Sequence, residues 1–204
     1  MAYVLGFISA DGSLLKNKRG AYFLELQITD AILLKQIRDI LGSNHKISKR
    51  IMPEPQKTAY RLQIGSKKIF YDLRNLGLGP KKSKVLEFPK IPKQFLGPFI
   101  RGYFDGDGSI WKGNTHKCRK VSNEALKLTF TSCSRIFLLG LKKILKNKFQ
   151  LKGALNCYGN AYRLNYSTRP ALSLYKIMYN RSDICLQRKK KIFEAFMINR
   201  GPVV

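Results

Sequence analysis

One short pattern occurs twice in this chain and constrains its fold more than any other feature. Residues 4–13 read VLGFISADGS and residues 100–109 read IRGYFDGDGS. Each copy is typical of about two turns of apolar helix that stop at glycine, with an aspartate at the end. Asp11 and Asp107 are 96 residues apart (107 − 11 = 96), close to half of the 204-residue chain. The spacing predicts a duplicated unit whose two copies each begin with an acid-ended helix.

Small residues occur at matching places in both motif helices. Gly6 and Ala10 are four residues apart, as are Gly102 and Gly106, so each pair lies on one face of its helix. Small residues at this spacing let two helix backbones approach closely. Packing of the helices about a pseudo-twofold axis would bring their C-terminal ends together and set the two aspartates side by side.

The charge of the chain indicates its partner. The 39 Lys and Arg residues against 12 Asp and Glu residues give a formal net charge of +27. Such an excess indicates a polyanionic partner, and nucleic acid is the one we expect. Ribosomal proteins and histones carry similar charge, so charge alone indicates no chemistry. The basic residues are spread along the chain, which favours a binding surface over a disordered tail.

Two carboxylates at neighbouring helix C-termini are electrostatically unfavourable, because they repel each other and face the negative ends of two helix dipoles. Mg²⁺ is the compensating cation we expect, since it accepts a few carboxylate ligands, keeps several waters and bridges phosphate oxygens. Metal ions beside carboxylates and lysines recur in phosphodiester hydrolysis. The alternative is that each Asp-Gly-Ser is only a helix stop before a turn. Its duplication in so basic a chain disfavours that interpretation.

Hydrophobic periodicity predicts helix, two strands, helix, two strands, helix in each half. In the first half, the expected elements after the motif are a hairpin turn at 14–20, a strand at 22–29, a helix capped by Asp30 and ended by Gly42, strands near 46–52 and 59–65, and a helix capped by Ser66. In the second half they are a basic loop at 112–122, a strand around 126–131, a helix capped by Ser134, and strands near 153–158 and 161–166.

The two halves also match in one strand, because residues 59–64 read AYRLQI and residues 161–166 read AYRLNY. The predicted fold class is therefore α+β, a tandem pseudo-twofold repeat of αββαββα units with two antiparallel sheets and the two motif helices at the repeat interface. We expect one repeat at 1–88, a proline-rich connection at 89–98 and the other repeat at 99–204.

The cysteines and the lengths of the apolar runs indicate where in the cell the protein is expected. Cys118, Cys133, Cys157 and Cys185 form no C-x-x-C pair, so we expect reduced thiols and no zinc site. The N-terminus shows no basic leader, and no apolar stretch reaches the ~20 residues of a membrane span. The sequence predicts an intracellular protein, not secreted and without a membrane partner, in the cytoplasm or nucleoid of a prokaryote or in an organelle.

The two motif stretches resemble the paired signature of the LAGLIDADG homing endonucleases, in the single-chain, two-motif form. The second copy is close to the family consensus, whereas the first has Ser9 where an acidic residue is common. The resemblance covers essentially the whole chain, because the element order of each half also agrees. It implies a monomer that cleaves both strands of a long, asymmetric or pseudo-palindromic double-stranded DNA site with Mg²⁺ and leaves short 3′ overhangs.

The resemblance also implies the metal site. It places the metal site at Asp11, Asp107, Ala10 and Gly106, with the two aspartates as the acidic ligands. Mn²⁺ or Ca²⁺ would fit the same positions as Mg²⁺. Since Asp11 is the family's second acidic position, the departure at Ser9 leaves the ligand intact in both copies.

Supporting catalytic groups in this family come from a polar strand residue and a lysine in each half. Gln27 matches the first position, while its counterpart Thr129 matches less well. The lysine candidates are Lys82 and Lys189, each among neighbouring lysines that fit nearly as well. Plain phosphate contact is the alternative role for both.

The predicted sheets would form a saddle that reads DNA, because a two-stranded ribbon of Arg, Lys, Gln and Asn side chains fits the major groove. A solvated sheet face is the alternative. The candidate DNA-binding residues are Glu25, Gln27, Lys46, Ser48, Arg50, Arg61, Gln63, Lys127, Thr129, Asn156, Arg163 and Asn165. Arg61, Gln63, Arg163 and Asn165 are favoured, because the repeat preserves their type.

Two other functions remain open from the sequence. An RNA-binding intron maturase on the same scaffold would have intron RNA as its partner and could coexist with cleavage. A non-catalytic DNA-binding regulator is disfavoured by the retention of Asp11 and Asp107. The chain lacks an N-terminal nucleophile and a terminal His-Asn pair, which favours a free-standing intron-encoded protein over an intein.

Overall fold

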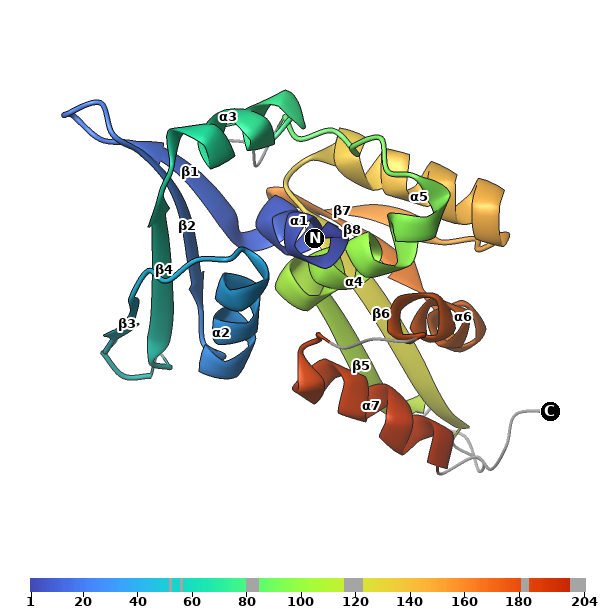
Figure 1. Cartoon of the computed structure of the whole chain (residues 1–204). Helices are drawn as coiled ribbons and strands as arrows, with labels where there is room; N and C mark the ends of the chain where they lie inside the picture. The colour runs from blue at the N-terminus through green and yellow to red at the C-terminus, as the bar shows by residue number, and fades with distance from the viewer. Residues whose placement is uncertain (52, 56, 80–84, 116–122, 181–183, 199–204) are drawn as a thin grey trace.

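The computed structural model describes residues 1–51, 53–55, 57–79, 85–115, 123–180 and 184–198. Each half contains helix, two strands, helix, two strands, helix, so the predicted α+β repeat is confirmed (Figure 1). The described elements are α1 (Ala2–Asp11), β1 (Gly12–Lys16), β2 (Tyr22–Ile28), α2 (Ala31–Ile40), β3 (Ile47–Arg50), β4 (Ala59–Gly65), α3 (Lys67–Asn75), the short 3₁₀ helix η2 (Lys93–Phe95), α4 (Leu96–Asp107), β5 (Gly108–Thr115), β6 (Asn123–Ser132), α5 (Arg135–Phe149), β7 (Ala154–Tyr158), β8 (Ala161–Tyr166), α6 (Thr168–Tyr179) and α7 (Gln187–Ile198).

Side-chain caps begin three helices where the sequence predicts them. Asp30, Ser66 and Ser134 each accept a hydrogen bond from the backbone N–H three residues later, at 2.8, 3.2 and 3.2 Å. A cap of this kind satisfies a helix N–H that lacks a partner and contributes roughly 1 kcal/mol. Gly42, with φ of +61°, follows the end of α2 in the left-handed conformation that glycine adopts readily.

Each half forms one four-stranded antiparallel sheet, with strand orders β1-β2-β4-β3 and β5-β6-β8-β7. The repeated sequence at 59–64 and 161–166 lies on β4 and β8, at the same place in each sheet. In the first sheet, Leu24 pairs with Ile64 and Leu26 with Leu62, and all four side chains are buried. One face of the sheet therefore joins the core while the alternate residues point the other way.

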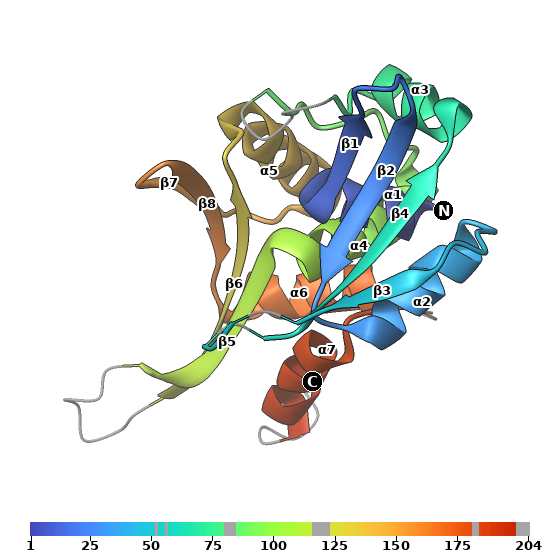
Figure 2. The same ribbon diagram turned by 90° about the vertical axis from the view of Figure 1, so that its left-hand side faces the viewer.

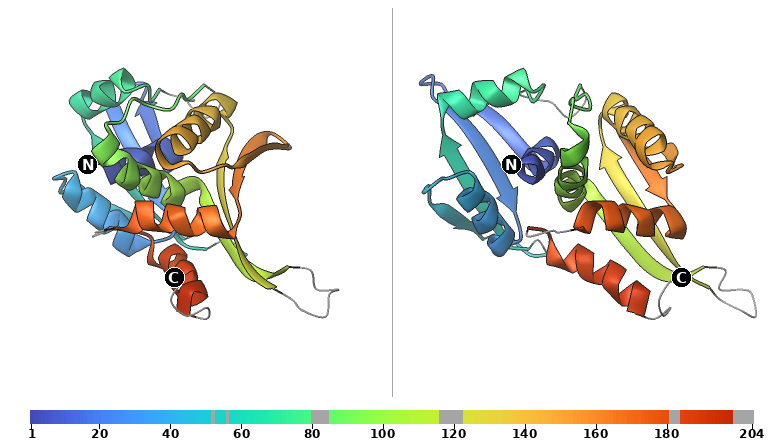
Figure 3. Two further views of the ribbon diagram at one scale, coloured as in Figure 1. Left: turned by 90° about the vertical axis from the view of Figure 1, so that its right-hand side faces the viewer. Right: turned by 45° about the vertical axis from the view of Figure 1, so that its right-hand side comes forward.

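Helices cover the core face of both sheets. In the first half α2 and α3 contact the sheet, and in the second half α5, α6 and α7 do so. Figure 2 looks onto the opposite face of the first sheet, where β1, β2 and β4 lie in front of the helices. Figure 3 shows α1 and α4 side by side between the two sheets, so one hydrophobic core runs through both halves.

The two motif helices touch through their glycines. A Cβ atom on Gly6 would lie 2.0 Å from the carbonyl oxygen of Phe99, and one on Gly102 would lie 2.0 Å from that of Tyr3. Since Tyr3 and Phe99 are themselves 96 residues apart, the contact is reciprocal, as in a twofold dimer interface. Lower down, the Cβ position of Gly106 is 2.5 Å from Cβ of Ala10. The predicted helix interface is therefore a backbone-to-backbone contact.

Two local expectations were wrong in detail, and two helices extend the predicted pattern. Residues 14–16 belong to β1, whose Leu14 is buried, so the hairpin turn is confined to 17–20. Strand β5 continues through the first part of the expected basic loop to Thr115, paired along its whole length with β6. Helix α4 extends the second motif helix back to Leu96, and α7 is a helix in addition to the predicted repeat. In each case, pairing or packing with distant residues outweighs the local sequence signal.

No helix among the described residues is long and apolar enough to cross a bilayer. Cys133, Cys157 and Cys185 are free thiols, and Cys118 lies outside the described residues. The division into repeats at 1–88 and 99–204 stays a prediction.

Replacing Gly102 with alanine should lower the free energy of unfolding by about 3 kcal/mol or more, because the new methyl group overlaps a backbone oxygen that cannot move away alone. Chemical denaturation of Gly102→Ala would measure this loss. Gly79→Ala is the matched control, since among the described residues no atom beyond its chain neighbours lies within 4 Å of the added Cβ. Equal stability of the two variants would contradict the close helix contact.

Candidate metal and nucleic-acid site

The two candidate metal ligands lie at the ends of α1 and α4. Asp11 and Asp107 are the last residues of their helices, and the next residue begins β1 or β5. Asp11 is exposed and Asp107 is half-buried. The Cβ position of Gly106 is 3.1 Å from Oδ2 of Asp11, so the Asp11 carboxylate lies directly against α4. The absence of a side chain at Gly106 leaves room for it there.

The charges of both acids affect the pKa values of two buried groups, Tyr103 and Lys189. Burial raises the pKa of the Tyr103 hydroxyl, and the negative charges of Asp107 and Asp11 raise it further. The same two charges also raise the pKa of Lys189, although burial has the larger, opposite effect. These shifts agree with the geometry, in which the Asp11 carboxylate lies against Gly106, the residue directly before Asp107.

Lys189 is buried, and its ammonium group lies at the C-terminal end of α4. Its Nζ donates hydrogen bonds to the carbonyl oxygens of Phe104, Asp105 and Gly108, at 2.6, 2.8 and 2.6 Å. These bonds use all three donors of the ammonium group and neutralise the negative end of the helix dipole. Burial nevertheless lowers the pKa of Lys189 to about 8. In this structure Lys189 therefore holds the backbone on both sides of Asp107.

Asp105 is a buried carboxylate that sequence reasoning did not single out. Its Oδ2 accepts hydrogen bonds from the Tyr3 hydroxyl and the Leu186 N–H, both at 2.8 Å. Burial raises the pKa of Asp105, and these two bonds and the Lys189 charge oppose that rise. The sequence signal that could have identified Asp105 is its mismatch with Ser9, which occupies the equivalent position in the first motif. In the structure Ser9 donates a hydrogen bond to the Leu5 carbonyl oxygen of its own helix.

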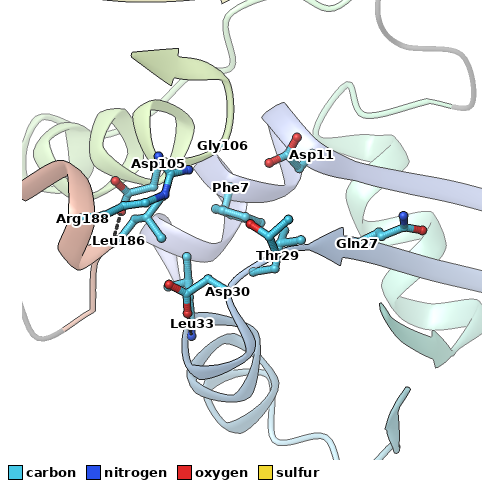
Figure 4. Close-up of a pocket in the computed structure, with 11 residues that line it drawn as sticks. Phe7, Asp11, Gln27, Thr29, Asp30, Leu33, Asp105, Gly106, Leu186 and Arg188 are labelled. Atoms are coloured by element: carbon cyan, nitrogen blue, oxygen red, sulfur yellow. Dashed lines mark hydrogen bonds between the residues drawn. The ribbon is translucent and has the colours of Figure 1, made fainter. Parts of the chain in front are cut away.

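A pocket lined by residues of both halves includes Asp11 (Figure 4). Asp11 and Gln27 line it from the first half, and Asp105, Gly106 and Arg188 line it from the second. The predicted supporting residue Gln27 is thus brought to the same pocket as Asp11, and its Oε1 accepts a hydrogen bond from Arg50 at 3.3 Å. Arg188 is a basic side chain of this pocket that the sequence prediction did not include.

The polar face of the first sheet is organised around Glu25. Nε of Arg61 donates to Oε2 of Glu25 at 2.7 Å, with a second contact from the same guanidinium, and Gln63 donates at 3.3 Å. Strand pairing sets Glu25 opposite Gln63 and Ser48 opposite Arg61, so these candidates share one face. Lys46 is exposed but lies just before β3 begins.

The polar face of the second sheet has different contacts. Thr129, opposite Asn165 in the pairing, donates from its hydroxyl to Oδ1 of Asn165 at 2.8 Å. Arg163 stacks over the Tyr158 ring at 3.7 Å from its centroid, while Lys127 and Asn156 are exposed. Thr129 is only 7% exposed, and the strand register sets it at the place of Glu25, so the residue equivalent to Gln27 in the structure is Thr131 and not Thr129. The two sheets therefore carry different polar contacts on similar backbones.

The residues at the helix ends fit a hard divalent cation. Two carboxylates meet there, and no group of three or more His, Cys, Asp or Glu side chains that could hold a metal occurs among the described residues. Carboxylate oxygens are ligands that suit an ion such as Mg²⁺, which also keeps waters and binds phosphate oxygens. Lys82 lies outside the described residues. The roles assigned to the individual site residues stay predictions.

Comparison with known proteins identifies related chains. A family model described as LAGLIDADG-like domain matches residues 1–76 and 95–177. Three similar solved structures are I-DmoI in complex with DNA and Mn (TM-score 0.60, 22% identity, 90% of this chain and 97% of that chain), the LAGLIDADG meganuclease I-AabMI bound to uncleaved DNA (0.63, 16%, 95% and 87%), and the meganuclease I-SmaMI bound to uncleaveable DNA (0.66, 14%, 94% and 87%).

One curated relative matches over part of its length. It is the DNA-directed RNA polymerase subunit Rpo1C of Methanocaldococcus jannaschii, 29% identical over 155 residues. The match covers 73% of this chain, and the chain spans only 17% of that relative's length.

Replacing Lys189 with methionine gives a test of its buried charge. In the folded protein its pKa is about 8, against 10.5 for an unperturbed lysine, so the unfolded chain binds more protons between these values. The free energy of unfolding of the wild type, relative to Lys189→Met, should therefore rise from pH 8 to pH 10.5, by at most about 1.4 kcal/mol per pH unit. Parallel denaturation curves across this range would contradict the assignment.

Proposed function

Because this chain belongs to the LAGLIDADG family and has the fold of its single-chain homing endonucleases, we propose that it is a site-specific endonuclease that cleaves double-stranded DNA. The observation that carries the proposal is the glycine contact between α1 and α4. It brings the carboxylates of Asp11 and Asp107 together between two polar sheet faces in a chain of net charge +27.

The two sheets account for a long DNA site. Each would enter the major groove of one half-site with its polar strands, and the acid pair at the repeat interface would lie at the centre of the site. Since Glu25, Arg61 and Gln63 in one half correspond to Thr129, Arg163 and Asn165 in the other, the preferred site is asymmetric or only pseudo-palindromic. The related I-DmoI, I-AabMI and I-SmaMI structures contain DNA, which supports this partner.

Asp11 and Asp107 would hold the divalent ion, and Mg²⁺ is the ion we propose because of this ligand set. Mn in the related I-DmoI complex supports the use of a divalent metal. When bound, the ion supplies charge neutralisation at the scissile phosphate and a more acidic water. We propose that Gln27, which shares a pocket with Asp11, orients a water molecule, and that Lys189, which binds the end of α4, keeps it fixed.

The finer properties are proposals that rest on the family. We propose that both strands are cut with short 3′ overhangs, that the protein acts as a monomer in intron homing, and that it works inside a prokaryotic cell or an organelle. The free thiols of Cys133, Cys157 and Cys185 agree with a reducing compartment.

Asp107→Asn should lower the rate of DNA cleavage about 100-fold or more, because it removes one of two charges that hold the metal. The assay is cleavage of a randomised duplex library with Mg²⁺ or Mn²⁺, read by sequencing of the cut ends. Asp72→Asn is the control, since Asp72 is an exposed residue of α3 paired only with Lys68 in the structure. Cleavage by Asp107→Asn at the wild-type rate would contradict the proposal, as would binding of structured RNA without any DNA cleavage.

DNA affinity should depend steeply on salt. If about ten phosphates are neutralised, the logarithm of the binding constant falls with the logarithm of salt concentration with a slope of about −9. Fluorescence anisotropy with the Asp107→Asn variant measures this slope without cleavage. A slope near zero would contradict binding through the basic sheet faces.

A further inference from the structure

Two large apolar side chains are exposed at equivalent places in the two halves. Leu15 is 39% exposed on β1 and Trp111 is 48% exposed on β5. Each follows its motif aspartate by four residues, so the two positions keep the 96-residue offset of Asp11 and Asp107. Each repeat therefore has an exposed apolar residue four positions after its motif aspartate.

Strand pairing shows which face of the sheet these residues occupy. Leu15 is two residues beyond Ser13, which pairs with Glu25, and Leu15 itself pairs with Phe23. Because side chains alternate along a strand, Leu15 shares the face of Glu25. The intervening Leu14 is 5% exposed and points into the core. Leu15 therefore lies on the polar face that the helices leave uncovered.

The same holds in the second half. Trp111 pairs with Lys127 and is two residues beyond Ser109, which pairs with Thr129. It thus occupies the face that carries the candidate DNA-binding residues of the second sheet, while Ile110 between them packs against the core. Neither apolar side chain is required by the core, and both would lie against DNA seated on the sheets.

The absence of a side chain at Gly113 leaves room for the Trp111 indole. A Cβ on Gly113 would lie 2.4 Å from Cζ2 of Trp111, so the ring lies over the bare backbone of its own strand. At the outer edge of β5 the ring also lines an open groove with Lys191, Ile192 and Ala195 of α7. Lys191 is exposed, which gives this edge a positive charge that suits a DNA backbone.

We propose that Leu15 and Trp111 are a symmetric pair of apolar base contacts, one on each side of the centre of the bound DNA. Their chemistry selects apolar features of base pairs, such as the thymine methyl group in the major groove, or a base step that opens to admit the side chain. The unequal sizes of leucine and tryptophan make the two contacts unequal. This inference rests on the proposed DNA-binding function and adds two specificity-determining residues to it.

Trp111 is the only tryptophan of the chain, so its fluorescence reports on this contact alone. The probe is a labelled duplex library selected for binding to Asp107→Asn, the variant in which slow cleavage is expected. We expect DNA binding, followed separately by anisotropy of the label, to protect the indole from quenching by acrylamide. Binding without any change in acrylamide quenching overturns the inference and leaves the proposed function standing. Absence of DNA binding overturns both.

Substitutions test the pair directly in the same background. Leu15→Ala and Trp111→Ala should each weaken binding of the selected DNA roughly tenfold and relax base preference at one position in its own half-site. Leu139→Ala is the matched control, because Leu139 is also 39% exposed but lies on α5, on the helix-covered side of the second sheet. Equal effects of Leu15→Ala and Leu139→Ala, or unchanged base preference in Trp111→Ala, would overturn the proposed pair of base contacts.

Discussion

The contact between the backbones of α1 and α4 is the constraint on which the rest of the structure depends. Any side chain at Gly6 or Gly102 would overlap a carbonyl oxygen of the opposite helix, so only glycine permits this distance. The contact fixes the distance between the helix ends, and with it that of Asp11 and Asp107. Neither repeat has a complete acid pair by itself. The function we propose is therefore a property of the interface between the repeats and not of either one.

Two ionisable groups are buried at the end of α4, and their burial costs folding free energy. Burying Lys189 disfavours its ammonium form, and burying Asp105 disfavours its carboxylate form. Hydrogen bonds to three carbonyls in one case, and from Tyr3 and Leu186 in the other, offset part of that cost. These bonds attach α4 to α1 and to the segment before α7. They hold the backbone on both sides of Asp107, which would support the metal site that we propose.

Local sequence signals placed most of the fold correctly, and their failures have a common cause. The caps at Asp30, Ser66 and Ser134 lie where short-range hydrogen bonding predicts them, because a cap depends only on residues within one helical turn. The turn assigned to 14–20 was too long and the loop assigned to 112–122 began too early, since β1 and β5 are held by pairing with β2 and β6. Thr129 alternates as a polar residue, yet its bond to Asn165 and the surrounding packing leave it buried.

The sequence by itself determined the duplication, the glycine spacing, the acid at the end of each motif helix and the expectation of a polyanionic partner. These follow from periodicity, helix geometry and charge, which need no knowledge of distant contacts. Only the tertiary structure decided that Asp105 is buried against Tyr3, that all three donors of Lys189 bind the end of α4, and that Leu15 and Trp111 face outward at matching places. Each of these depends on residues far apart in the chain, whose approach is set by packing of the two repeats and cannot be inferred from local pattern.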